Sequence, residues 1–239
     1  EGVLDSRAFY AGKTASNGTD RYIWGWCPTR AGNDNTAVGA APAEPEWAGN
    51  LVMHKIIQHE DGTLSLGSVD GILNKYTNNT TLKVMAQSET GVAESNDNYT
   101  LSGDAYVLFN RLNVHNKLTF TVTASSNEDI FGISLARGTD PKKYYSLIIN
   151  PEDNNSNRKI NFEQKGKEGI GFIAGIDGYK FPADNIYHVT ICTDNSVCTV
   201  YINDNVAYTN RIYGIQKNCW SLDSYEGSIQ VSNIKVSYY

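Results

Sequence analysis

Alternating apolar and polar residues recur along this chain of 239 residues, and no window shows a convincing helical period. In the clearest case Leu118, Phe120, Val122 and Ala124 alternate with threonines. That pattern is typical of a strand with one buried face. Similar short segments, separated by turn residues, continue to the C-terminus. The spacing predicts an all-β fold, namely a two-sheet antiparallel β-sandwich of the jelly-roll or concanavalin-like type.

The last segment, residues 228–238, departs from a strict two-residue period. Ile229 and Val231 share one phase, whereas Ile234 and Val236 share the other. A period that slips by one residue implies a β-bulge. We therefore expect a bulge near residues 232–233.

The four cysteines are Cys27, Cys192, Cys198 and Cys219, and they show no Cys-x-x-Cys zinc pattern. A two-residue turn at residues 194–195 would place Cys198 on an apolar face and Cys192 on the opposite face. We therefore expect Cys192 and Cys198 to stay unpaired.

Three of the four tryptophans fall within residues 21–66. Trp24 and Trp26 are two positions apart, so on a strand they point to the same face and form one aromatic wall. Such a wall is either part of a hydrophobic core or a platform on which a sugar stacks. The spacing alone favours the core.

Two groups of residues carry a resemblance to a known family. The first comprises Asp5, Phe9-Tyr10-Ala11, Lys13-Thr14, Arg21-Tyr22-Ile23, Gly25-Trp26, Trp47, Leu51 and Asp61-Gly62-Thr63-Leu64. This order resembles the last propeller blade of family 32 glycoside hydrolases, which include invertases, inulinases, levanases and other β-fructosidases. The second group comprises residues 189–191, Asp194, Ser196, residues 200–203, Ala207, Thr209 and residues 211–213. It resembles a late hairpin and the following strand in the C-terminal β-sandwich of that family. The stretch between them, about residues 76–185, matches only in its strand-rich character.

The resemblance implies a blade-like segment at residues 1–67, from a five-bladed propeller, and a sandwich domain at residues 68–239. The family's catalytic carboxylate motifs lie in earlier blades, and none of them occurs in this sequence. We therefore name no catalytic residue. The chain resembles the C-terminal part of a β-fructosidase, and we expect it to be inactive alone.

The resemblance also implies a substrate-binding role for Trp26, which matches a residue lining the sugar pocket, and for Tyr10 and Asp5 near it. Packing within the blade is an equally good explanation for Tyr10, and a turn cap for Asp5. Two other functions stay open: a carbohydrate-binding module of the lectin-like sandwich type, and a purely structural or dimerisation domain.

The composition narrows the possible partners. The net charge of −6 without a basic run argues against nucleic acid, and no apolar run is long enough for a membrane span. No metal or cofactor motif appears. The expected partners are a fructose-containing oligo- or polysaccharide, and the missing N-terminal propeller part or a second chain. The family and composition suggest a secreted, periplasmic or cell-surface protein, although no signal-peptide pattern is present.

Overall fold

The computed structural model describes residues 4–6, 8–30, 45–138, 144–153, 159–165, 172–176, 179–216 and 218–239. These residues form three antiparallel sheets and one short helix, so the prediction of an all-β fold is confirmed. The described part of the chain contains no helix with the length and hydropathy needed to cross a membrane.

The first sheet has the strand order β1-β2-β3-β4. Its strands are β1 (Tyr10–Ser16), β2 (Arg21–Arg30), β3 (Pro45–Gln58) and β4 (Leu64–Gly67), and α1 (Asp70–Leu73) follows. The predicted boundary at residue 67 coincides with the end of β4. That boundary, and the interpretation of residues 1–67 as a propeller blade, stay predictions.

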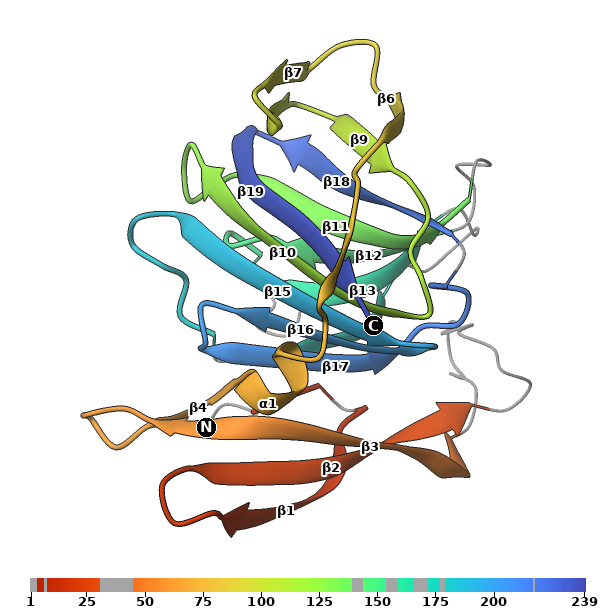
Figure 1. The fold of residues 1–239 in the computed structure, drawn as a ribbon. Helices are drawn as coiled ribbons and strands as arrows, with labels where there is room; N and C mark the ends of the chain where they lie inside the picture. Colours follow the sequence, from red (N-terminus) through yellow and green to blue (C-terminus); the bar gives the residue numbers. More distant parts are fainter. Residues whose placement is uncertain are drawn as a thin grey trace.

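The second and third sheets form the sandwich (Figure 1). The second has the order β17-β16-β15-β10-β19-β8-β7, with β5 also paired to β19. Its strands are β5 (Asn78–Thr80), β7 (Val92–Ser95), β8 (Asn98–Ser102), β10 (His115–Ala124), β15 (Ile186–Asp194), β16 (Val197–Ile202), β17 (Val206–Arg211) and β19 (Ser228–Tyr238). The third has the order β14-β13-β12-β11-β18-β9-β6. Its strands are β6 (Val84–Gln87), β9 (Ala105–Phe109), β11 (Ile130–Arg137), β12 (Tyr144–Ile149), β13 (Ile160–Lys165), β14 (Phe172–Ile176) and β18 (Cys219–Glu226).

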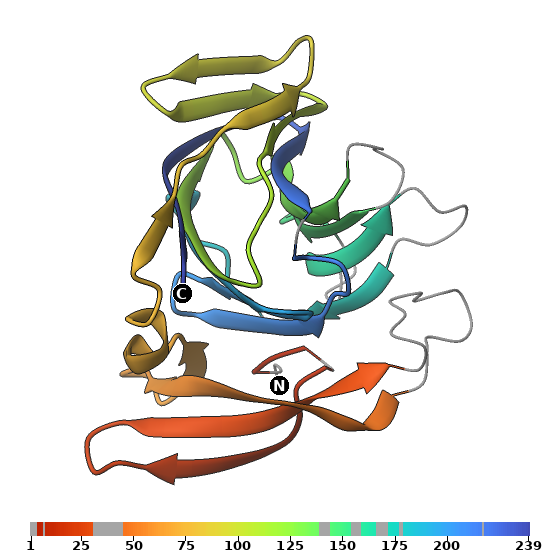
Figure 2. The ribbon, with the colours of Figure 1, turned by 45° about the vertical axis from the view of Figure 1, so that its right-hand side comes forward.

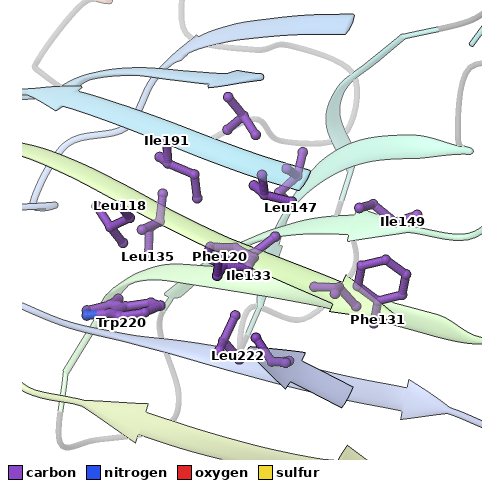
Figure 3. Packing of buried hydrophobic residues seen from close by; sticks show 14 of the residues in the cluster. Leu118, Phe120, Phe131, Ile133, Leu135, Leu147, Ile149, Ile191, Trp220 and Leu222 are labelled. Carbon is purple, nitrogen blue, oxygen red and sulfur yellow. The ribbon is translucent and has the colours of Figure 1, made fainter. Parts of the chain in front are cut away.

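The main core lies between the second and third sheets (Figure 3). Strand β10 contributes Leu118 and Phe120, which are 0% and 3% exposed, while its threonines are only half-buried. The alternation read from the sequence is therefore confirmed. The third sheet contributes Ile133, Leu147 and Trp220 from the opposite side.

Strands β16 and β17 are buried along their whole length, because they have a layer on each side. One side faces the main core, and the other faces the first sheet (Figures 1 and 2). Leu66 of the first sheet packs there against Tyr201 and Ala207. Cys27 and Val197 belong to a second small cluster at the same junction.

The hairpin between β15 and β16 separates its two faces as expected, but its turn lies one residue later. Asp194 pairs with Val197, so the turn is formed by residues 195–196 instead of 194–195. Asn195 has φ 51°, and asparagine is among the non-glycine residues that adopt this conformation most readily. Thr193, not Cys192, stands opposite Cys198, and none of the four cysteines, all of which lie among the described residues, forms a disulfide.

The bulge expected in the last strand is also present. The pairing of β10 with β19 shifts between Thr119–Lys235 and Thr121–Ser232, and Asn233 has φ 56°. The phase change in the sequence thus located the irregularity.

Candidate functional site

Strand β2 presents different residues to its two faces. Ile23 and Cys27 pack toward the sandwich. Because side chains alternate along a strand, Trp24 and Trp26 point to the opposite face, as the sequence predicted. Trp26 is half-buried and stands opposite Leu51 of β3, which is 74% exposed.

Tyr10 and Trp26 lie together at this face. They are direct partners in the β1–β2 pairing, and their rings meet edge-on with centroids 6.1 Å apart. Tyr10 is 54% exposed. Partly exposed aromatic residues such as tyrosine and tryptophan, which join an apolar ring to a polar group, are suited to contact ligands that are part apolar and part polar, as sugars are. The pair is therefore the candidate binding surface of the first sheet.

Asp5 lies in a different place, in the interface between the N-terminal segment and β17. Its carboxylate accepts hydrogen bonds of 2.6 Å from the backbone N–H and from Oγ1 of Thr209. Nε2 of His54 lies 2.9 Å from the same carboxylate, and Asp5 is only 8% exposed. In this chain Asp5 thus holds two parts of the fold together, and its contact with sugar stays a prediction.

The residues around Asp5 connect this interface to the aromatic strand. Nδ1 of His54 lies 3.0 Å from the Tyr201 hydroxyl, and the His54 ring contacts Phe9 with centroids 4.8 Å apart. The Phe9 ring occupies the space that a Cβ atom on Gly25 would need. Gly25 therefore receives Phe9 on the sandwich side, while its neighbour Trp26 points outward.

Arg211, at the end of β17, ties the sandwich to strands β2 and β3. Its guanidinium donates to the carbonyls of Cys27 at 2.7 Å and Pro28 at 2.8 Å, and to the Asn50 side chain at 2.8 Å. Arg211 is 4% exposed. Buried backbone carbonyls need such donors, so this residue makes a polar interface possible.

A pocket of about 160 Å³ opens at the same junction, between β3, α1 and the β15–β16 hairpin. Leu51, Tyr76, Cys192 and Tyr201 are among its lining residues, whereas Asp5, Tyr10 and Trp26 are not. Burial raises the pKa of Cys192 to about 12 and raises the pKa of Tyr201. These groups stay protonated at neutral pH, so they offer no general base.

No group of three or more His, Cys, Asp or Glu side chains suited to a metal ion occurs among the described residues. The sequence did not identify His54, Thr209 and Arg211 as interface residues, although the latter two belong to the family resemblance. The available signal was the polar run from Thr209 to Arg211 at the end of an otherwise apolar strand.

Comparison with known families and structures agrees with this architecture. The family model described as "GH32, BT1760-like, C-terminal domain" matches residues 62–236. No curated protein matches the sequence.

Several solved structures share the fold. The exo-inulinase of Aspergillus awamori is 13% identical, with a TM-score of 0.61 over 97% of this chain and 43% of that chain. The GH32 β-fructofuranosidase BmSUC1 of Bombyx mori is 13% identical, with a TM-score of 0.55 over 98% of this chain and 41% of that chain. A mutant of that enzyme was solved in complex with sucrose. The sucrose-6-phosphate hydrolase of Lactobacillus gasseri is 13% identical, with a TM-score of 0.55 over 97% of this chain and 41% of that chain.

At this identity the likeness concerns the fold, and the chain spans only 41–43% of the length of these enzymes. The family match, in contrast, covers most of the chain, from the turn before β4 into β19. The chain therefore belongs to the family of GH32, BT1760-like, C-terminal domains.

Proposed function

We propose that this chain is the C-terminal part of an enzyme that hydrolyses β-fructosides, a fructan or sucrose. In this proposal Tyr10 and Trp26 form one wall of the substrate pocket, and the sandwich holds that wall in place. The observation that carries it is the ring pair on the outer face of the first sheet. The opposite face of that sheet is fixed to the sandwich through Asp5, His54 and Arg211.

The two faces of the first sheet have separate tasks. A sugar pocket needs walls held within a fraction of an ångström, which requires rigid support behind the contacting side chains. Asp5 would act as a positioning residue behind the wall, since its carboxylate fixes the segment from which Phe9 and Tyr10 continue. Family membership supports the substrate class, as does the sucrose complex of the Bombyx mori relative.

Hydrolysis of a glycosidic bond requires a pair of carboxyl groups, one on each side of that bond. We propose that these come from an N-terminal propeller part or from a second chain, which would be the partner of this one. The chain by itself would then release no sugar. We also propose a secreted, periplasmic or cell-surface location, on the family and the composition.

The test is calorimetric titration of the chain with sucrose and with inulin- and levan-type oligosaccharides, together with an assay for released fructose. We expect binding without turnover. Trp26→Ala and Tyr10→Ala should each weaken that binding, whereas Tyr22→Ala, on the same strand face but away from the pair, should not. Release of fructose by the chain alone would contradict the assignment of the carboxylates to another part.

A carbohydrate-binding role for the sandwich is a second candidate function. A specific observation favours it, namely that Tyr106, Tyr144 and Arg137 lie together on the outer face of the third sheet. If the chain has a purely structural role, Trp26→Ala and Tyr10→Ala should leave sugar affinity unchanged.

A further inference from the structure

The outer face of the third sheet carries a polar and aromatic cluster that the proposed pocket wall does not use. It extends across four neighbouring strands, β9, β18, β11 and β12. Tyr106 pairs with Asp223, and Ser134 pairs with both Ser221 and Ser146. Their strand neighbours, such as Val107, Leu222 and Ile133, lie in the core, so the cluster faces away from it.

Arg137 joins this cluster because of a β-bulge. Ile133 and Leu135 point into the core, and strict alternation would send Arg137 there too. The β11–β18 pairing instead shifts between Ser134 and Arg137, and Ala136 has φ 55°. Ala136 packs against the core, so Arg137 emerges on the outer face.

That backbone conformation is costly. The left-handed region is unfavourable for any residue with a Cβ, and alanine has no side-chain group to offset the strain. Bulges recur beside binding sites because they redirect a side chain. The fold therefore retains a strained residue whose visible effect is the placement of one arginine.

The guanidinium of Arg137 contacts two tyrosine rings and makes its hydrogen bonds through one nitrogen. Its Nη1 donates to Ser221 Oγ at 2.5 Å and to Asp223 Oδ1 at 2.6 Å. Its centre lies 4.1 Å from the Tyr106 ring and 4.6 Å from the Tyr144 ring. Arg137 is 5% exposed. The hydrogen bonds that it makes with described residues all come from Nη1, which leaves Nε and Nη2 as two parallel donors.

The charge balance indicates what those donors can bind. Asp223 is itself held by Ser134 Oγ at 2.6 Å and by Ser221 Oγ at 3.0 Å, and it faces the arginine. The ion pair has no excess positive charge, so it favours a neutral ligand over an anion. Two parallel donors beside half-buried phenol rings match two adjacent hydroxyls on a sugar ring.

We propose that Arg137, Tyr106 and Tyr144 form a separate carbohydrate subsite that binds the vicinal hydroxyls of a neutral sugar, a fructosyl unit of a fructan. The identity of the sugar rests on the proposed function. The subsite lies on the outer face of the third sheet, whereas the first sheet packs on β16 and β17 of the second. It would hold a second part of the polysaccharide while the pocket wall contacts the unit to be cleaved.

The test is calorimetric titration of the whole chain with levan- and inulin-type oligosaccharides, with Arg137→Lys, Tyr144→Ala and Trp26→Ala as variants. Arg111→Lys, on an exposed arginine, is the matched control. We expect Tyr144→Ala and Arg137→Lys to weaken one binding event at least about tenfold while leaving the fold intact by circular dichroism. Arg111→Lys should have no effect. Should Arg137→Lys fail to fold, Tyr144→Ala decides.

The outcomes separate the two proposals. Loss of binding in Trp26→Ala alone would overturn the subsite and leave the pocket wall standing. Loss in Tyr144→Ala alone would support the subsite and count against the wall. The absence of binding in the unmodified chain would overturn the subsite, as would tighter binding of an oligogalacturonide, which carries carboxylates.

Discussion

Asp5 and Thr209 lie 204 positions apart in the chain, and their hydrogen bonds join the N-terminal segment to the sandwich. Both residues are buried, so neither group could find water in place of the other. A buried polar contact of this kind contributes little when it is complete and is costly when one partner is removed. A single substitution at such a contact should therefore produce a measurable loss of stability.

Asp5→Asn should lower the free energy of unfolding by about 1–3 kcal/mol, because an amide has one acceptor oxygen and its NH₂ group cannot accept the hydrogen bond that Thr209 Oγ1 now donates to the carboxylate. Denaturant unfolding at pH 7 measures this. The control is Asp20→Asn, which weakens a partly exposed pair with Lys55 and should lower stability much less than Asp5→Asn does. Equal stability of both variants would mean that the Asp5 interface contributes nothing.

Asp129 should make a contribution to the folding stability of the chain that is lost in acid. Burial acts to raise the pKa of Asp129, but hydrogen bonds from the side chains and backbone of Ser125 and Ser126 outweigh it, so the pKa lies below its ordinary value. A lowered folded-state pKa stabilises the protein above the unfolded-state pKa of about 3.9, and that stability is lost as pH falls through the folded-state pKa.

Asp129→Asn should therefore destabilise the chain by about 1–3 kcal/mol at pH 7, with a deficit that shrinks below about pH 4. Unfolding curves of both proteins at pH 7, 5 and 3 measure this. A deficit that stays constant over this range would show that the carboxylate charge is not involved.

At the scale of the element, β2 is a strand whose two faces serve different neighbours. Trp24 and Trp26 point outward, while Ile23, Gly25 and Cys27 face the sandwich side. Gly25 is required because the Phe9 ring fills its Cβ position, and Phe9 in turn contacts His54. One glycine thus determines how closely the N-terminal segment approaches the sheet.

Gly25→Ala should displace Phe9 and destabilise the chain by about 1–3 kcal/mol, as overpacking does. Gly71→Ala in α1 is the control, since a Cβ there meets nothing within 4 Å, and it should be neutral or slightly stabilising. Thermal unfolding compares the two. A neutral Gly25→Ala would contradict the tight packing of Phe9.

At the scale of the whole molecule, the edge strand β17 and its neighbour β16 are packed on both sides, which unites the first sheet and the sandwich. The polar end of β17 is part of this junction, because Arg211 supplies donors to carbonyls of β2. The first sheet is thus attached by satisfied polar contacts as well as by apolar packing.

Arg211→Lys should loosen the first sheet, because a single ammonium group cannot reproduce the planar fork that serves several acceptors. We expect a loss of about 2–5 kcal/mol and faster amide hydrogen exchange in β2 and β3 than in β10. Arg111→Lys should change neither quantity. Uniform exchange across all sheets would contradict a junction that depends on Arg211.

Much of the fold could be predicted because strand patterning is local. The alternation in β10, the faces of the β15–β16 hairpin and the bulge near Asn233 depend only on neighbouring residues. The hairpin turn was placed one residue early, because two adjacent positions with Asp, Asn or Ser fit a tight turn almost equally well.

The sequence by itself determined the all-β class, the faces of the strands and the family. The tertiary structure decided what individual residues do. Asp5 lies against Thr209, a contact that the sequence does not indicate because the two residues are 204 positions apart, and its proximity to a sugar stays a prediction. Arg137 reaches the outer face through a bulge at an alanine, a residue that carries no local signal for that conformation. Contacts between distant residues leave no periodic trace in a sequence, so only the folded chain reveals them.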